Sequence, residues 1–295
     1  MSKPFFIESR NAYAKVTELL TLINAATFSV SRFQQSHDDD NMRSNEFDSK
    51  ELNKYTPHQL KSFFCKILLV NACAIYEGWL DDFSHRFKLG NKFKIQLQYP
   101  DTIVDEIEDV KSKKAFTDDL AKEAFGSLYM QYLKSKRINK NLLRNRIICY
   151  RYFKESRNCY IHGDGRVNEK LIQAQSHYLR LTEEDIGFEK LPEIRCCHLG
   201  DEVEITSHGV RGLLGVIQSI ILTCDCEFVN TRMGEAQFLK RWGKEVARHG
   251  LKVGKAKSEI TRCINRCFYD ILHLNKPPKM QAMIRYLESK RRIVY

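Results

Sequence analysis

The sequence predicts an all-α fold, a helical bundle of the kind that carries a basic helical extension at its C-terminal end. Three observations lead to this prediction. Long segments place apolar residues three and four positions apart, which is the period of a helix buried on one face. Only 14 Gly and 6 Pro occur in 295 residues, too few for a turn-rich β protein. A hydrophobic share of 43% is ample for a buried core, so extensive disorder is not expected.

The first two predicted helices are long. Residues 10–36 form the first, and its apolar positions at helical spacing include Val16, Leu19, Leu20 and Ile23. The acidic and polar stretch HDDDNMRSNEFDS follows as a connection. The second helix is expected to start after Thr56, a favourable N-cap followed by Pro57, and to continue to about residue 87. Its wide apolar face predicts that it is the central helix of the core.

The remainder of the main domain also has helical periodicity. Residues 103–137 predict one or two helices, and residues 141–162 predict a long helix that ends at the sequence GDG, where Gly stops a helix. A short helix then starts within VNEKLIQAQSHYL. In the turn-rich segment 181–205, DEVEIT alternates as a short strand would. An apolar helix from Thr206 is expected to close the domain near residue 230.

The net charge of +11 is concentrated at one end of the chain. Residues 235–295 contain 15 Lys and Arg against 5 Asp and Glu, so this segment alone holds +10. We therefore divide the chain into a main domain, residues 1–232, and a basic C-terminal extension of two or three helices, residues 233–295. Such an extension favours an anionic partner, RNA or another nucleic acid before a membrane surface, although excess cations also serve solubility.

The basic extension mixes cations with Phe238 and Trp242, a composition typical of surfaces that bind a nucleic-acid backbone. The candidate RNA-binding residues are Lys240, Arg241, Lys244, Arg248, Lys252, Lys255 and Lys257. Two other interpretations stay open. The apolar residues of the extension can pack on the main domain and leave an ordinary charged face, or the face can bind an inhibitory or activating protein.

The ten cysteines do not have the spacing of a disulfide framework or a zinc site. Cys263 and Cys267 share a helix face, but His273 is the only further ligand nearby, so no metal is expected. The N-terminal sequence MSKPFFIESR lacks the apolar core of a signal peptide, and no membrane-spanning run is expected. These features predict a cytoplasmic protein with reduced thiols and no membrane partner.

Residues 157–165, RNCYIHGDG, place Arg157, Asn158 and His162 within six positions. A guanidinium is always charged and binds two phosphate oxygens at once. A histidine exchanges protons near neutral pH, and can act on a ribose 2′-hydroxyl or on a leaving 5′-oxygen. The amide can orient the His side chain or the phosphate. Together these groups can cleave a phosphodiester bond without a metal ion.

The same helix offers further polar residues. A helical stripe with spacings of 4, 3 and 4 is formed by Arg151, Glu155, Asn158 and His162, and Lys154 lies about one turn before Arg157. The simpler interpretation is a solvated helix end, in which a terminal His interacts favourably with the helix dipole. Tyr160 can likewise stack on a base or belong to the core.

Arg157-Asn158-x3-His162 resembles the Arg-x4-His motif of the HEPN superfamily (higher eukaryote and prokaryote nucleotide-binding domains), with its polar residue directly after the Arg. The continuation HGDGRVNEK resembles the signature common among bacterial members. The segment LGDEVEITSHGVRGLLGVI is similar to the Gly-Asp and final helix that close these domains. The resemblance covers about residues 10–230 and includes the order of the helices.

The resemblance implies a metal-independent endoribonuclease of bacterial defence or of a toxin–antitoxin pair, with no cofactor. Such enzymes pair two motifs across one composite site, which implies a homodimer. His162 would be the general acid or base, Arg157 would stabilise the phosphorane, and Asn158 would position its neighbours. The products would carry 2′,3′-cyclic phosphate and 5′-hydroxyl ends.

Two carboxylates are candidates for supporting roles at this site. Glu155 resembles the acidic residue often found just before the motif, but pairing with Arg151 is an equal alternative. Glu77, on the second long helix, is the other candidate, with a dimer contact or a lysine pair as its alternative use. Arg151 and Lys154 complete the supporting set.

Two other functions compete with the nuclease. The first is a catalytically silent HEPN-like module that dimerises and binds RNA, nucleotide or a partner protein. The second is a DNA-binding protein that uses the basic extension, although no helix-turn-helix is recognisable.

Overall fold

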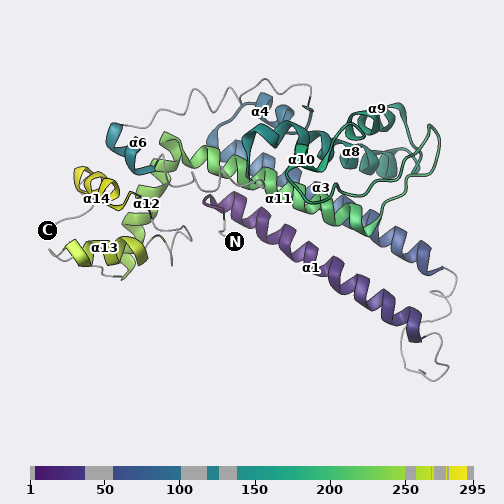
Figure 1. Cartoon of the computed structure of the whole chain (residues 1–295), viewed down its shortest axis with the longest axis horizontal. Coiled ribbons are helices and arrows are strands. Elements are labelled where there is room, and N and C mark those ends of the chain that lie inside the picture. Colours follow the sequence, from purple (N-terminus) through teal and green to yellow (C-terminus); the bar gives the residue numbers. More distant parts are fainter. Residues whose placement is uncertain are drawn as a thin grey trace.

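The structure is a computed structural model that describes residues 4–36, 56–100, 118–125, 138–249, 257–266, 268, 277 and 279–290. The described part is all-α, as predicted. Four long helices form the body: α1 (Ile7–Ser36), α3 (Pro57–Phe87), α8 (Leu143–His162) and α11 (Ser207–Val229). In Figure 1, α3 and α11 run through the middle of the elongated body, with α1 along one side and α8 on the other.

Short helices complete the body. These are α4 (Asn91–Gln96), the 3-10 turn η2 (Lys140–Leu142), α9 (Glu169–Tyr178) and α10 (Glu183–Ile186). The polar stretch after residue 36 lies outside the described residues, as does most of 103–137, of which only α6 (Asp119–Phe125) is described as a helix.

The predicted strand at residues 201–206 is wrong. Within the described ranges no strand forms, and DEVEIT contributes only an isolated antiparallel bridge between Glu202 and Arg166. The Val203 amide donates to the Gly165 carbonyl at 2.8 Å, which ties this segment to the turn after α8. Val203 and Ile205 are buried, so the alternation indicated burial correctly, but the pairing partner is too short to make a sheet.

The ends of the long helices follow from local sequence. Thr56 caps α3 in a capping box: its hydroxyl accepts from the Gln59 amide, and the Gln59 side chain accepts from the Thr56 amide. Thr206 caps α11 by accepting from the Gly209 amide at 2.9 Å. Thr56 and Thr206 were both placed at these helix starts from sequence alone.

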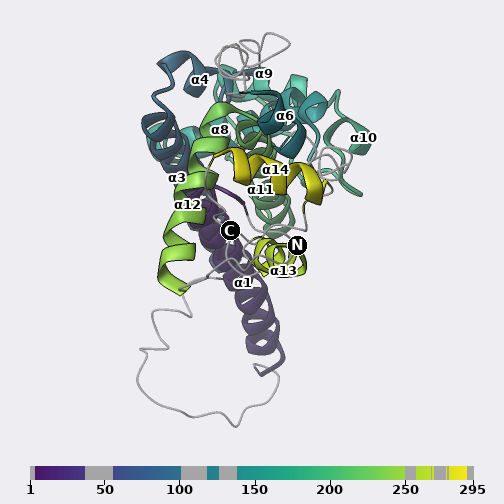
Figure 2. The same ribbon diagram turned by 90° about the vertical axis from the view of Figure 1, so that its left-hand side faces the viewer.

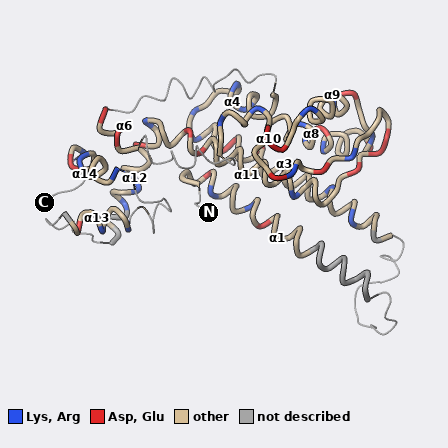
Figure 3. The backbone as a smooth tube through the Cα atoms, viewed as in Figure 1, with Lys and Arg blue, Asp and Glu red and all other residues tan. Residues whose placement is uncertain are grey.

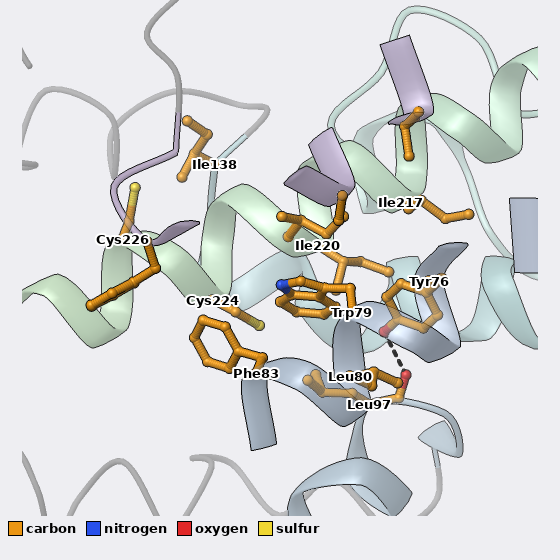
Figure 4. Packing of buried hydrophobic residues seen from close by; sticks show 14 of the residues in the cluster. Tyr76, Trp79, Leu80, Phe83, Leu97, Ile138, Ile217, Ile220, Cys224 and Cys226 are labelled. Carbon is orange, nitrogen blue, oxygen red and sulfur yellow. Dashed lines mark hydrogen bonds between the residues drawn. The ribbon is translucent and has the colours of Figure 1, made fainter. Parts of the chain in front are cut away.

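The core lies between α3 and α11 and is rich in aromatic residues. Figure 4 shows Trp79 and Tyr76 of α3 beside Ile217 and Ile220 of α11. The Tyr76 hydroxyl donates to the Leu97 carbonyl at 2.7 Å, so this buried phenol is satisfied. The prediction that the second long helix is central to the core is confirmed.

A buried carboxylate fixes the start of the chain to the core. Asp225 of α11 accepts hydrogen bonds from the backbone amides of Phe5 and Phe6, at 2.5 and 3.0 Å. Burial raises the pKa of Asp225 to about 6, against the lowering effect of these hydrogen bonds. Asp225 thus satisfies amides just before α1, where a helix N-terminus favours an acceptor.

The C-terminal helices form a second cluster at one end of the body, seen end-on in Figure 2. They are α12 (Arg232–His249), α13 (Lys257–Arg266) and α14 (Met280–Ser289). α12 starts next to the predicted domain boundary, but α6, from much earlier in the chain, packs against α14. Phe125 of α6 meets Phe238 and Tyr286 edge-to-face, each with ring centroids 5.1 Å apart.

The apolar residues of the extension pack inward. This agrees with the interpretation in which they belong to the core and leave an ordinary charged face outside. The buried set includes Phe238, Trp242, Ile260, Ile264 and Phe268. Two ion pairs attach α6 and its flank to α14 and its end: Arg285 with Glu123 at 3.0 Å, and Lys290 with Asp118 at 2.8 Å.

Within the described ranges, two helices, α3 and α11, are by length and composition apolar enough to cross a membrane. The expectation that no membrane-spanning run occurs stays a prediction, because the length and composition of a buried core helix pass the same test. Half of the apolar window of α3 and most of that of α11 are buried in the bundle.

Candidate active site

The motif helix α8 ends in a tight turn. The amides of Gly163 and Gly165 both donate to the Cys159 carbonyl, at 2.9 and 3.1 Å. Asp164 and Gly165 have φ values of 49° and 74°, the left-handed region in which Gly is favoured. The predicted stop at GDG is confirmed, and it leaves His162 as the last helical residue.

Arg157 and Glu77 lie together at the contact between α8 and α3. The Nη2 of Arg157 donates to the Oε1 of Glu77 at 2.5 Å, and the Nζ of Lys154 is 3.1 Å from the same oxygen. The Tyr150 hydroxyl donates to it at 3.4 Å. Two cations and a phenol of α8 thus converge on one carboxylate oxygen of α3.

Arg157 also interacts with the buried thiol of Cys73 on α3. Burial raises the pKa of the Cys73 thiol to about 12, and Arg157 acts against this increase at close range. Burial lowers the pKa of Arg157, but Glu77 raises it more in combination with Cys73 and Tyr150. The guanidinium therefore stays charged and confined, with 16% of its side chain exposed.

A second polar cluster lies on the neighbouring face of α8. Glu155 is buried, with 3% of its side chain exposed, and pairs with the guanidinium of Arg151. Its other oxygen accepts from the Nδ2 of Asn158 at 3.3 Å. Arg151 also stacks over the Tyr99 ring at 4.1 Å from the centroid. The predicted pairing of Glu155 with Arg151 is present, and Glu155 additionally fixes Asn158.

His162 lies apart from both clusters. It is exposed, and no hydrogen bond or ion pair of its side chain occurs with the described residues. Tyr160 beside it is half-buried, with the Nζ of Lys66 5.4 Å from its ring centroid. Among the predicted residues, Arg157 and Lys154 both contact Glu77. Asn158 and Arg151 both contact Glu155. Within the described residues, His162 contacts neither of these two clusters through a hydrogen bond or an ion pair.

Several neighbours of this site were not predicted. Tyr150 lies two turns before Arg157, and that spacing could have indicated a shared face. Cys73 lies one turn before Glu77 on α3. The side chains of Gln98 and Lys154 also form a hydrogen bond. No sequence signal places Gln98 or Tyr99 beside α8.

The predicted RNA-binding residues of the extension differ in their surroundings. Lys240 and Lys244 are exposed on α12. Arg241 is half-buried and stacks on the Phe5 ring at 4.8 Å, so it serves the fold. Lys252 and Lys255 lie outside the described residues, as do the side chains of Arg248 and Lys257.

Charges of both signs share this end of the molecule. Figure 3 shows Lys and Arg of α12 to α14 near Asp and Glu of α6 and α14. Because two of these cations pair with α6 and its flank, the net charge of the extension overstates its free positive surface.

The cysteines and the possible metal ligands can be placed only within the described residues. Nine cysteines are described, and each is free. Among the described residues, no group of three or more His, Cys, Asp or Glu side chains could hold a metal ion. Cys267 and His273 lie outside the described residues.

Comparison with known proteins gives no match: no family model, no curated protein and no solved structure matches the chain. The resemblance to the HEPN superfamily therefore stays a prediction that rests on the motif and the order of the helices.

Proposed function

We propose that this protein is a metal-independent endoribonuclease of the HEPN type, an effector of bacterial defence or of a toxin–antitoxin pair. The observation that carries the proposal is the surroundings of Arg157. A confined, charged guanidinium lies beside a second cation, Lys154, on the helix whose exposed end carries His162. An anion-binding group and a free proton-transfer group on one rigid helix are what cleavage of a phosphodiester requires.

The chemistry follows from these groups. One His162 takes the proton of the 2′-hydroxyl, whose oxygen then attacks the adjacent phosphorus. Arg157 stabilises the charge that develops on the phosphorane oxygens. A second His162 donates a proton to the leaving 5′-oxygen, so that the products carry 2′,3′-cyclic phosphate and 5′-hydroxyl ends. Asn158, fixed by Glu155, positions the neighbouring groups.

The need for two histidines fits a homodimer, and exposed apolar residues support one. Phe63 and Ile67 of α3 are 57% and 40% exposed, and Ile161 beside His162 is 44% exposed. The contact of Lys66 with Tyr160 shows that this part of α3 runs along the end of α8. A second copy that covers these side chains would bring two His162 side chains toward one another.

Lys240 and Lys244 support contact with RNA away from the reacting groups. Both are exposed, and lysines on a surface bind the phosphate backbone without reading its sequence. The same surface suits an acidic inhibitor or activator protein, which is the competing use.

The second candidate function is a silent HEPN-like module that dimerises and binds RNA or nucleotide. The pairing of Arg157 with Glu77 favours it, because a guanidinium paired with a carboxylate is less available to stabilise the charge of a phosphorane. Expression in a bacterial host separates the two functions. The nuclease predicts that the wild-type chain arrests growth and that His162→Ala does not. Equal growth of the two strains at matched protein levels would favour the silent module.

A further inference from the structure

Three side chains on one face of α8 converge on Glu77 of α3. Tyr150, Lys154 and Arg157 are spaced by four and three positions, so their side chains share this face. All three contact the same Oε1 of Glu77, at distances between 2.5 and 3.4 Å. A hydroxyl, an ammonium and a guanidinium are therefore already oriented toward one negatively charged oxygen.

This donor set suits a phosphate group better than a single carboxylate. Lys154 and Arg157 together carry two positive charges, whereas Glu77 supplies one negative charge. A phosphate group has more acceptor oxygens than a carboxylate, and Arg and Lys are its usual ligands. Arg157 also interacts with the buried thiol of Cys73, so the guanidinium has a second neighbour on α3 besides Glu77.

Glu77 is the outermost member of the group. Its side chain is 30% exposed, against 16% for Arg157 and 11% for Lys154. The carboxylate is therefore the group of this cluster that solvent or a ligand reaches first, while the two cations lie deeper against α8.

We propose that Tyr150, Lys154 and Arg157 form a subsite for an RNA phosphate, and that Glu77 occupies this subsite until the phosphate displaces it. This inference rests on the proposed function, and it adds a regulation: the unliganded enzyme masks its own arginine. Glu77 is then an internal competitor of the substrate.

The inference predicts the direction in which one substitution changes the affinity for phosphate. Glu77→Gln keeps the size and an acceptor oxygen but removes the competing charge, so binding of inorganic phosphate should become about tenfold tighter at low ionic strength. If Glu77 instead positions Arg157 for the ligand, the same change weakens phosphate binding. Glu123→Gln is the matched control, because it removes the partner of Arg285 at the far end of the molecule.

The measurement is isothermal titration of each folded protein with inorganic phosphate, together with the rise in Tm at saturating phosphate. Tighter binding by Glu77→Gln, which Lys154→Met in the same chain abolishes, is the expected result. Unchanged or weaker binding by Glu77→Gln would overturn the inference. Competition identifies the ligand: a short single-stranded RNA should displace phosphate at about tenfold lower concentration than a nucleoside monophosphate, since it makes several phosphate contacts. Equal potency would overturn the assignment to RNA.

Cleavage of a labelled RNA by the same proteins separates the two proposals. Tight phosphate binding by Glu77→Gln with no cleavage by any variant would leave the subsite in place and reject the nuclease. Cleavage by the wild type without any gain in phosphate binding on Glu77→Gln would reject the subsite and leave the nuclease.

Discussion

Asn158 donates a hydrogen bond from its amide nitrogen to Glu155 at 3.3 Å, and this direction leaves the amide oxygen of Asn158 as an acceptor for another partner. Glu155 also pairs with Arg151, so one buried carboxylate connects three residues of α8. The arrangement fixes a polar side chain directly beside Arg157, where the proposed reaction needs it.

Glu155→Ala should destabilise the fold by about 2 to 4 kcal/mol, since it leaves the mostly buried Arg151 without its carboxylate. Urea unfolding measures the change. Glu123→Ala is the control, because its exposed pair with Arg285 should contribute less than about 1 kcal/mol. Equal losses in the two variants would show that the Glu155 cluster has no special role.

Gly212→Ala should destabilise the protein by about 1 to 3 kcal/mol through overpacking. A Cβ at position 212 would lie 2.6 Å from the Cβ of Pro192, so the loop that packs on α11 would have to move. Thermal unfolding measures the loss. Gly78→Ala is the matched control: it meets nothing within 4 Å on helix α3, and should stabilise by up to about 1 kcal/mol.

Asp225 should make stability depend on pH between about 4 and 6. Its pKa is raised by burial to about 6 from a usual value of 3.8, so the folded chain binds a proton more tightly than the unfolded chain. The resulting stabilisation is fully present below pH 3.8 and is lost as pH rises through 6, by about 2 to 3 kcal/mol.

Unfolding by urea at a series of pH values tests this, with Asp225→Asn as the variant that cannot titrate. The stability of the wild type relative to Asp225→Asn should fall from pH 4 to pH 6.5. A difference that stays constant over this range would show that Asp225 does not titrate as its burial requires.

Lys240→Gln combined with Lys244→Gln should weaken RNA binding and reduce its salt dependence. Each lost phosphate contact lowers the slope of log K against log salt by about 0.7 for single strands. Fluorescence anisotropy of a labelled RNA measures this, in a His162→Ala background that prevents cleavage. Unchanged affinity and slope would assign the α12 surface to another use. Arg241→Ala should instead lower Tm, because Arg241 packs on Phe5.

Much of the fold could be predicted from the sequence, because its signals are local. Thr56 and Pro57 determine the start of α3, and the GDG turn determines the end of α8. The alternation of DEVEIT gave the wrong element, because a strand also needs an extended partner, and in the described residues the short segment around Arg166 forms only an isolated bridge with it. The packing of α6 with α14 could not be predicted, since it joins segments that are distant in the sequence.

Part of the candidate site could likewise be predicted from the sequence, and part of it could not. The stripe along α8, including the Arg151–Glu155 pair, follows from helical spacing. The contact of Glu77 with Arg157 spans 80 positions, and it depends on how α3 and α8 are aligned, which residue spacing within one helix does not determine. Glu77 was a candidate from its place on the second helix, and the lysine pair given as its alternative occurs with Lys154, but its contact with Arg157 was not foreseen.

The most direct test of the account is cleavage of total RNA by the purified protein in EDTA, followed by analysis of the new ends. The variants are His162→Ala and, as the matched control, His198→Ala, which removes a fully solvent-exposed histidine outside the site. We expect cleavage by the wild type and by His198→Ala, with 2′,3′-cyclic phosphate and 5′-hydroxyl ends, and none by His162→Ala. Cleavage that His162→Ala retains, or intact RNA with every protein, would contradict it.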